Sequence, residues 1–231
     1  MMTPFRSTLA LCSVLAMATL PIAAHADDYD YKPRTLVYEV TITNITKGQV
    51  FSPPVLVTHS RDVALFEAGQ PALEELAIVA EDGDGAPLAD LVGSLPEVFE
   101  AQSTTAPIPP GASAVYRIES NRRFRVLSVV SMLVNTNDAF LAIDSRSLPR
   151  SRFSTRSFSA NAYDAGSEAN NEDCAFIPGP ACPPDSGNAR TPDGGEGFVH
   201  IHNGVHGIAD LAADAYDWRN PVARVSVRRV R

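Results

Sequence analysis

The sequence lacks the features that mark several common enzyme classes. It contains no G-x-S-x-G motif, which would carry a nucleophilic serine, and no glycine-rich loop that binds phosphates. Only three cysteines are present, and none stands apart as a catalytic thiol, because Cys12 lies in an N-terminal apolar run and Cys174 and Cys182 lie close together. These absences argue against nucleophilic catalysis, and we expect a protein that is not an enzyme.

Positive charge is also scarce. The chain has 19 Lys and Arg against 27 Asp and Glu, for a net charge of −8. An acidic chain disfavours a general role in nucleic-acid binding, which depends on neutralising phosphates. The few basic residues include two short clusters, "RRFR" (122–125) and "RRVR" (228–231). They predict either solvated strand faces or a basic strip for an anionic glycan or lipid headgroup.

The first 26 residues have the layout of a cleaved secretory signal. Arg6 precedes the apolar run 7–20, and "AHA" (24–26) places small residues before a cleavage point. The run is too short for a comfortable membrane span. We therefore expect a signal peptide over 1–26, a short extension over 27–35, one domain over 36–231 with no membrane span, and a secreted or periplasmic location.

Export to an oxidising compartment predicts a disulfide between Cys174 and Cys182. It would close a short proline-rich loop.

The rest of the chain is typical of an all-β protein. Short segments rich in Val, Ile and aromatic residues alternate apolar with polar positions, as half-buried strands do. Helical spacing is confined to 71–80 and 88–93, and there is no alternation of strands with helices. We expect an antiparallel β-sandwich of about eight strands, with one or two short helices in connections. The expected strands cover 36–43, 53–59, 114–120, 124–134, 139–143, 154–160, 197–202 and 222–230.

Carboxylates crowd into the segment 162–173, "AYDAGSEANNED". Carboxylates this close repel one another unless water or a cation separates them. Calcium prefers such oxygens on flexible backbone. Asp138, in the turn before the strand 139–143, could converge with Asp164 and Glu168 if the two loops meet at one end of the sandwich. The alternative is a solvated acidic loop that binds nothing specific.

Two other patterns could bind metal. "HIHNGVH" (200–206) places His200, His202 and His206 close together, which suggests a zinc or copper site and a metalloenzyme as an alternative. "DGDG" (82–85) resembles the start of an EF-hand loop, but Ala86, Pro87 and Gly93 stand where that loop needs other residues. We interpret 82–85 as a helix-terminating turn.

Several segments together resemble the spondin N-terminal domain, a family of extracellular matrix proteins and short bacterial secreted proteins. The resemblance is carried by residues 38–59, 66–84, 131–144, 163–173 (with the motif D-A-G-x-[DE]) and 220–230. It implies a C2-like β-sandwich that binds Ca²⁺ at one end through Asp138, Asp164 and Glu168. The last of these replaces an Asp in the animal proteins. Glu172 and Asp173, later in the same segment, are expected to face solvent or to add charge around the site.

The resemblance also implies a recognition or adhesion module. We therefore expect an exported calcium-binding module that recognises a protein or glycan at a cell surface or in the envelope. A structural envelope protein is a further alternative.

Overall fold

The computed structural model describes residues 34–187, 189–191 and 194–231. The expected signal peptide and all but two residues of the expected extension lie outside this part of the chain. Across the described ranges, no helix has the length and apolar character needed to cross a membrane.

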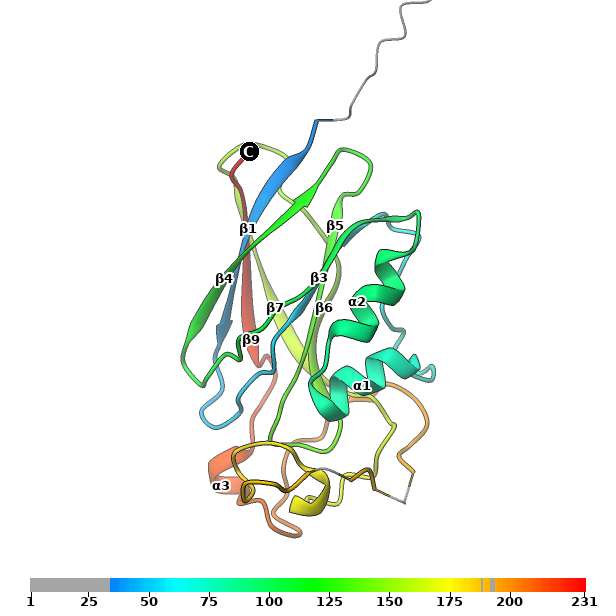
Figure 1. Ribbon diagram of the computed structural model, residues 1–231. Helices are drawn as coiled ribbons and strands as arrows, with labels where there is room; N and C mark the ends of the chain where they lie inside the picture. The colour runs from blue at the N-terminus through cyan, green and yellow to red at the C-terminus, as the bar shows by residue number, and fades with distance from the viewer. Residues whose placement is uncertain (1–33, 188, 192–193) are drawn as a thin grey trace, which may run out of the picture. The chain divides into compact units, whose positions relative to one another are not determined.

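In the described residues, nine strands and three short helices make up the fold (Figure 1). The strands are β1 (Leu36–Asn44), β2 (Val55–His59), β3 (Val98–Ser103), β4 (Ser113–Ser120), β5 (Val126–Met132), β6 (Ala139–Ser147), β7 (Thr155–Asp164), β8 (His200–Ile201) and β9 (Ala223–Arg229). The helices are α1 (Glu74–Asp82), α2 (Ala86–Gly93) and α3 (Ala213–Tyr216), with one 3₁₀ turn, Cys174–Phe176. The expected antiparallel, sandwich-like all-β fold is confirmed.

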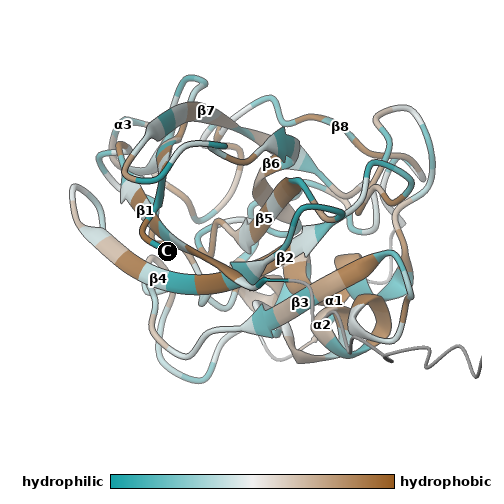
Figure 2. Ribbon diagram, turned by 90° about the horizontal axis from the view of Figure 1, so that it is seen from above, coloured by the Kyte–Doolittle hydropathy of each residue, from teal (hydrophilic) through white to brown (hydrophobic). Residues whose placement is uncertain are grey.

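All strand pairs are antiparallel, and the order along the sheet is β3-β2-β5-β6-β7-β9-β1-β4, with β8 beside β7. Strand β7 joins the two layers, because residues 155–160 pair with β9 and residues 161–164 pair with β6. Seen down the strands, the sheet curves almost into a ring (Figure 2). The sheet therefore bends at β7 and brings its two end strands, β3 and β4, near each other.

Side chains of β2 and β3 form hydrogen bonds to the main chain of β4. Thr58 Oγ1 donates to the Glu119 carbonyl at 2.7 Å, and Gln102 Nε2 donates to the Arg117 carbonyl at 3.3 Å. Glu100 accepts the main-chain N–H of Glu119. Among the described strands no ladder closes the ring between β3 and β4, and side chains of β2 and β3 bridge the gap instead.

Two hydrophobic clusters hold the layers together. The larger one lies between the two layers and includes Val40, Leu127, Leu141 and Val225. The smaller one lies between the outer face of β2, β5 and β6 and helices α1 and α2. Because both faces of β2 and β5 are covered, every residue of these strands is buried, whereas the outer face of β4 remains exposed.

The turn at 82–85 ends α1, as its sequence predicts, and α2 begins directly after it. Gly83 caps α1 in the left-handed conformation, with φ of 70°. Pro87 lies in the first turn of α2, where its missing N–H costs nothing.

Three elements differ from the sequence prediction. Strand β3 was not expected; all six of its residues are half-buried, so no alternation marks it. Helix α3 was not expected either and has only four residues. The strand expected over 197–202 is reduced to β8, because Val199 instead pairs its main chain with Gly69 and Gln70.

Candidate metal site

Asp138 and Asp164 meet at one end of neighbouring strands. Asp138 directly precedes β6 and Asp164 ends β7, and the antiparallel register pairs Ala139 with Asp164. The Ala165 N–H also donates to the Asp138 carbonyl at 3.2 Å. Both side chains are completely buried. The convergence expected for these two carboxylates therefore exists.

Only one oxygen of Asp138 is hydrogen-bonded. Oδ2 accepts the main-chain N–H groups of Ser167 at 2.9 Å and Glu168 at 3.0 Å, and the Ser167 hydroxyl at 3.3 Å. Oδ1 is buried with no hydrogen-bond partner among the described residues. Burial, followed by the negative charge of Asp164, raises the pKa of Asp138 to about 7.

Both carboxylate oxygens of Asp164 accept a hydrogen bond, unlike those of Asp138. Its Oδ1 accepts the Gly166 N–H at 2.8 Å, and its Oδ2 accepts the Asn170 side-chain amide at 2.7 Å. Burial nevertheless raises the pKa of Asp164, although both hydrogen bonds and His200 oppose the shift.

Gly166, in the D-A-G-x-[DE] motif, allows the chain to pass close to Phe198. Its φ is 68°, and a Cβ atom there would lie 2.4 Å from the Phe198 carbonyl oxygen. The Gly197 N–H donates to the Gly166 carbonyl at 2.8 Å. The glycine therefore fixes segment 196–200 against the turn that follows β7.

Glu168 contacts the site through its main chain, not its carboxylate. Its N–H binds Asp138, but its Oε1 accepts the Thr191 N–H at 2.9 Å. Burial raises the pKa of Glu168 to about 7, with Glu81 and Asp82 of α1 adding to the rise and Thr191 and Arg190 opposing it. In this structure the Glu168 carboxylate connects the loop to the segment near α1.

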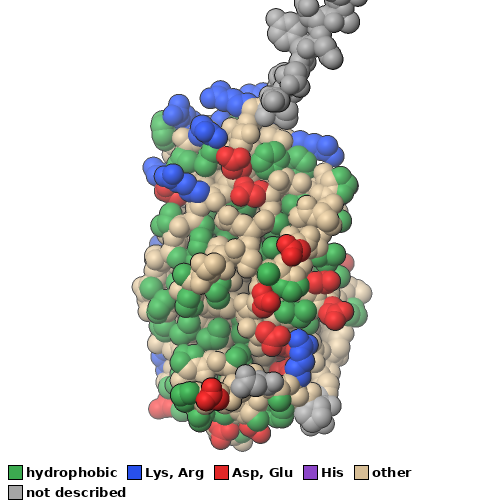
Figure 3. All heavy atoms as spheres, viewed as in Figure 1, with side chains coloured by type: hydrophobic (Ala, Val, Ile, Leu, Met, Phe, Trp, Pro, Cys, Tyr) green, Lys and Arg blue, Asp and Glu red, His purple; other side chains and the backbone are tan. Residues whose placement is uncertain are grey.

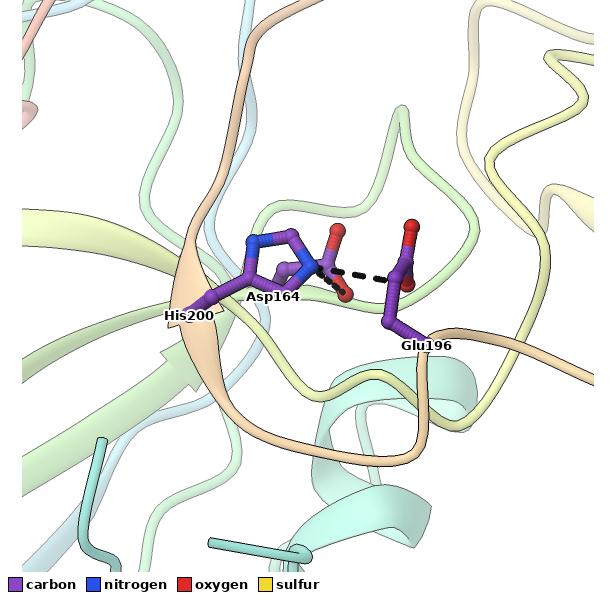
Figure 4. A group of neighbouring side chains, drawn as sticks. All are labelled: Asp164, Glu196 and His200. Carbon is purple, nitrogen blue, oxygen red and sulfur yellow. Dashed lines mark ion pairs between the residues drawn. The ribbon is translucent and has the colours of Figure 1, made fainter. Parts of the chain in front are cut away.

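A different trio brings its ligand atoms together. Asp164, Glu196 and His200 each offer one atom, and these atoms lie within 4.8 Å of one another (Figure 4). His200 Nε2 lies 3.4 Å from Glu196 Oε2 and 3.7 Å from Asp164 Oδ1. Burial opposes protonation of His200, but the hydrogen bond to the Ile201 carbonyl and the two carboxylates outweigh it, so the pKa of His200 is raised.

Glu196 was missed at the sequence level. Its only signal is its position between glycines, in "GGEGF" (194–198), directly before the expected strand 197–202. Its approach to Asp164 depends on the path that Gly166 imposes on this segment.

The three histidines of "HIHNGVH" do not form one cluster: His200 and His202 lie beside different oxygens of Asp164, and His206 lies beside Glu172. His202 is buried; its Nδ1 accepts the Gly204 N–H, so its Nε2 carries the proton and donates to Asn170 Oδ1 at 3.0 Å. Burial lowers the pKa of His202 to about 4. His206 is 57% exposed, and its Nδ1 lies 3.7 Å from Glu172 Oε1. In the described part of the chain, only His200 of these three belongs to a group of possible metal ligands. His202 Nε2 lies 3.7 Å from Asp164 Oδ2 and also supports Asp164 through Asn170.

Glu172 and Asp173 were expected to face solvent or to add charge around the site. Glu172 instead is buried, and its carboxylate accepts the main-chain N–H groups of three consecutive residues, His206, Gly207 and Ile208. Asp173 caps the 3₁₀ turn by accepting the Ala175 N–H. Both carboxylates therefore organise the loop, a role that the local sequence does not reveal.

The predicted disulfide between Cys174 and Cys182 is confirmed, with Cα atoms 5.3 Å apart. Changing both cysteines to serine is expected to lower the free energy of unfolding by about 2–3 kcal/mol, because the bond restricts a short loop in the unfolded chain. Chemical denaturation of the variant and of the oxidised wild type measures the difference. An unchanged denaturation midpoint would contradict the expectation.

A scan against protein-family models gave no match to this chain. A search of curated proteins gave no match either. The resemblance to the spondin N-terminal domain therefore stays a prediction.

Proposed function

We propose that this protein is an exported recognition or adhesion module, without catalytic activity, in which a calcium ion orders one end of the sandwich. The observation that carries the proposal is the Asp138 carboxylate, which is completely buried and has one oxygen without a hydrogen-bond partner among the described residues. A buried carboxylate oxygen with no donor is costly, and a bound cation would satisfy it.

The neighbouring groups fit a hard divalent cation. Asp164 brings a second fully buried carboxylate next to Asp138, and the two negative charges repel each other unless a cation lies between them. Calcium takes six to eight oxygens from carboxylates, carbonyls and water, and accepts irregular loop geometry. Glu196 can add a third carboxylate. Glu168, the third predicted ligand, would first have to release the Thr191 N–H.

The recognition role rests on the resemblance to the spondin domain and on the exported location that the N-terminal sequence and the disulfide favour. In this proposal, calcium fixes the loops that follow β7 and precede β8. Those loops would then present a defined surface to a protein or glycan partner in the envelope or on a cell surface.

Thermal melting with about 5 mM calcium and with chelator tests the site. Calcium at about ten times its dissociation constant should stabilise the folded state by about 1.4 kcal/mol and raise the melting temperature by a few degrees. Asp164→Asn should abolish this rise. Asp90→Asn, an exposed change on α2, should preserve it. A wild type that shows no rise, after its calcium has been removed, would contradict the proposal and favour a purely structural protein.

A second candidate is a transition-metal enzyme, and His200 is the observation that favours it. Its Nε2 is buried without a hydrogen-bond partner among the described residues and lies beside two carboxylates. Imidazole with carboxylates suits zinc better than calcium. In this case the purified protein would retain zinc, His200→Ala would release it, and His206→Ala would not.

A further inference from the structure

A cavity of about 400 Å³ lies at the end of the sandwich where β1 begins and β9 ends. Its apolar wall includes Leu36, Tyr38 and Leu148. No carboxylate is among its lining residues. Five arginines line it: Arg61, Arg122, Arg125, Arg150 and Arg229. We call this cavity the arginine pocket.

None of these five guanidinium groups forms an ion pair with a carboxylate in the part of the chain that the structure describes. Three of them are held by neutral acceptors. Arg61 donates to the Ser147 hydroxyl at 2.6 Å, Arg125 to the Arg122 carbonyl at 2.6 Å, and Arg229 to the carbonyls of Arg231 and Arg150. The hydrogen bonds position these groups without neutralising their charge.

The remaining two, Arg122 and Arg150, are exposed, and within the described ranges their side chains make no hydrogen bond. Two of the five arginines, Arg229 and Arg125, also act on the Tyr38 hydroxyl. Burial raises the pKa of Tyr38, and the charges of Arg229 and Arg125 both oppose that rise.

This concentration of positive charge is unusual in a chain whose net charge is −8. Figure 3 shows Lys and Arg gathered at the end of the sandwich near the C-terminus, with several Asp and Glu nearer the other end. The arginine pocket includes Ser147 at the end of β6, whereas Asp138 precedes the first residue of the same strand. Nine residues of strand span about 30 Å, so the pocket is separate from the candidate metal site.

We propose that the arginine pocket binds a ligand that carries a phosphate group, either a small phosphorylated solute or the headgroup of a phospholipid. Guanidinium groups bind phosphate oxygens through paired hydrogen bonds, and several unneutralised arginines suit a multiply charged group better than a single carboxylate. The cavity volume is within the usual range for small-ligand sites, and the apolar wall can contact the uncharged part of the ligand.

Calorimetric titration with pyrophosphate, in chelator, tests the proposal independently of any metal. The wild type should bind pyrophosphate, and Arg122→Gln/Arg150→Gln should bind it about tenfold or more weakly. The control Arg117→Gln/Arg224→Gln removes the same charge from exposed positions outside the pocket and should stay within about twofold at physiological salt. The single variant Arg150→Gln provides a milder change if the double variant unfolds.

Sedimentation with vesicles distinguishes the two sources of phosphate. Binding to phosphatidylcholine vesicles that contain phosphatidic acid, lost in the pocket variant, would support a lipid headgroup. Pyrophosphate binding without vesicle binding would support a soluble ligand. Absence of pyrophosphate binding at millimolar concentration, or equal weakening in the pocket and control variants, would overturn the proposal.

Discussion

Replacing Glu172 with alanine is expected to lower the free energy of unfolding by about 2–4 kcal/mol. The Glu172 carboxylate accepts three main-chain N–H groups, from His206 at 2.5 Å, Gly207 at 2.7 Å and Ile208 at 2.9 Å. Alanine would leave these three donors without their charged acceptor. It would also release the segment that follows β8 from the loop that follows β7. Chemical denaturation of the full chain measures the loss.

Two further variants give this prediction its controls. Glu172→Gln keeps a hydrogen-bond acceptor but not the charge, so its loss should be smaller than that of Glu172→Ala. Glu67→Ala removes an exposed carboxylate with no hydrogen bond in the described part of the chain, and should change the free energy of unfolding by no more than about 0.5 kcal/mol. If Glu172→Ala were as mild as Glu67→Ala, the carboxylate would not hold the loop.

In chelator at pH 8, Asp138→Asn is expected to raise the free energy of unfolding by about 2–4 kcal/mol. The pKa of Asp138 is about 7 in the folded protein, above its ordinary value of 3.8, because burial and Asp164 disfavour its ionised form. The folded state therefore binds more protons than the unfolded state between about pH 4 and pH 7. Wild-type stability falls across that interval as pH rises, whereas asparagine has no charge to bury.

The pH dependence provides the check. The stability difference between Asp138→Asn and wild type should be near zero below about pH 4 and reach its full size above about pH 7. Calcium should stabilise the wild type at pH 8 and leave the asparagine variant unchanged, because the variant lacks the ligand. If Asp138→Asn had a lower free energy of unfolding than wild type in chelator at pH 8, the ionised Asp138 carboxylate would not destabilise the folded state, and the prediction would be wrong.

Much of the fold can be predicted from local pattern, since a strand with one covered face alternates apolar and polar residues. Strand β1 is such a case, with every second side chain buried from Leu36 to Asn44. Strand β3 could not be predicted in this way. Each of its residues is half-buried between β2 and α2, so neither face of the strand is distinctly apolar. Strand β8 is shorter than its apolar pattern indicates, since Val199 pairs with a loop far away in sequence.

The positions of some residues in the candidate site can likewise be predicted from local sequence, and those of others cannot. Asp138 and Asp164 could be predicted to converge because the turn before the expected strand 139–143 and the loop after the expected strand 154–160 can meet at one end of a sandwich. Glu196 and the carboxylates of Glu168 and Glu172 could not be placed. Their positions depend on contacts across a long irregular segment: Glu172, for example, accepts an N–H from a residue 34 positions later. An acidic sequence alone cannot distinguish a ligand from a carboxylate that accepts main-chain hydrogen bonds.

The arginine pocket illustrates the same limit for basic residues. The sequence shows two clusters more than a hundred residues apart, 122–125 and 228–231. They come together because β1 pairs with β4 on one side and with β9 on the other. Arg61 and Arg150 join from two further connections, and neither belongs to a basic cluster.

The near-closure of the sheet at β3 and β4 has a consequence for how copies of this protein meet. A free strand edge presents unpaired N–H and C=O groups that a strand from another molecule can extend, which is a common route to aggregation. Along β4, the carbonyls of Arg117 and Glu119 and the N–H of Glu119 are already occupied by side chains of Gln102, Thr58 and Glu100. A strand that paired along residues 117–119 would have to displace all three, so hydrogen bonds within the same molecule protect this part of the β4 edge from edge-to-edge association.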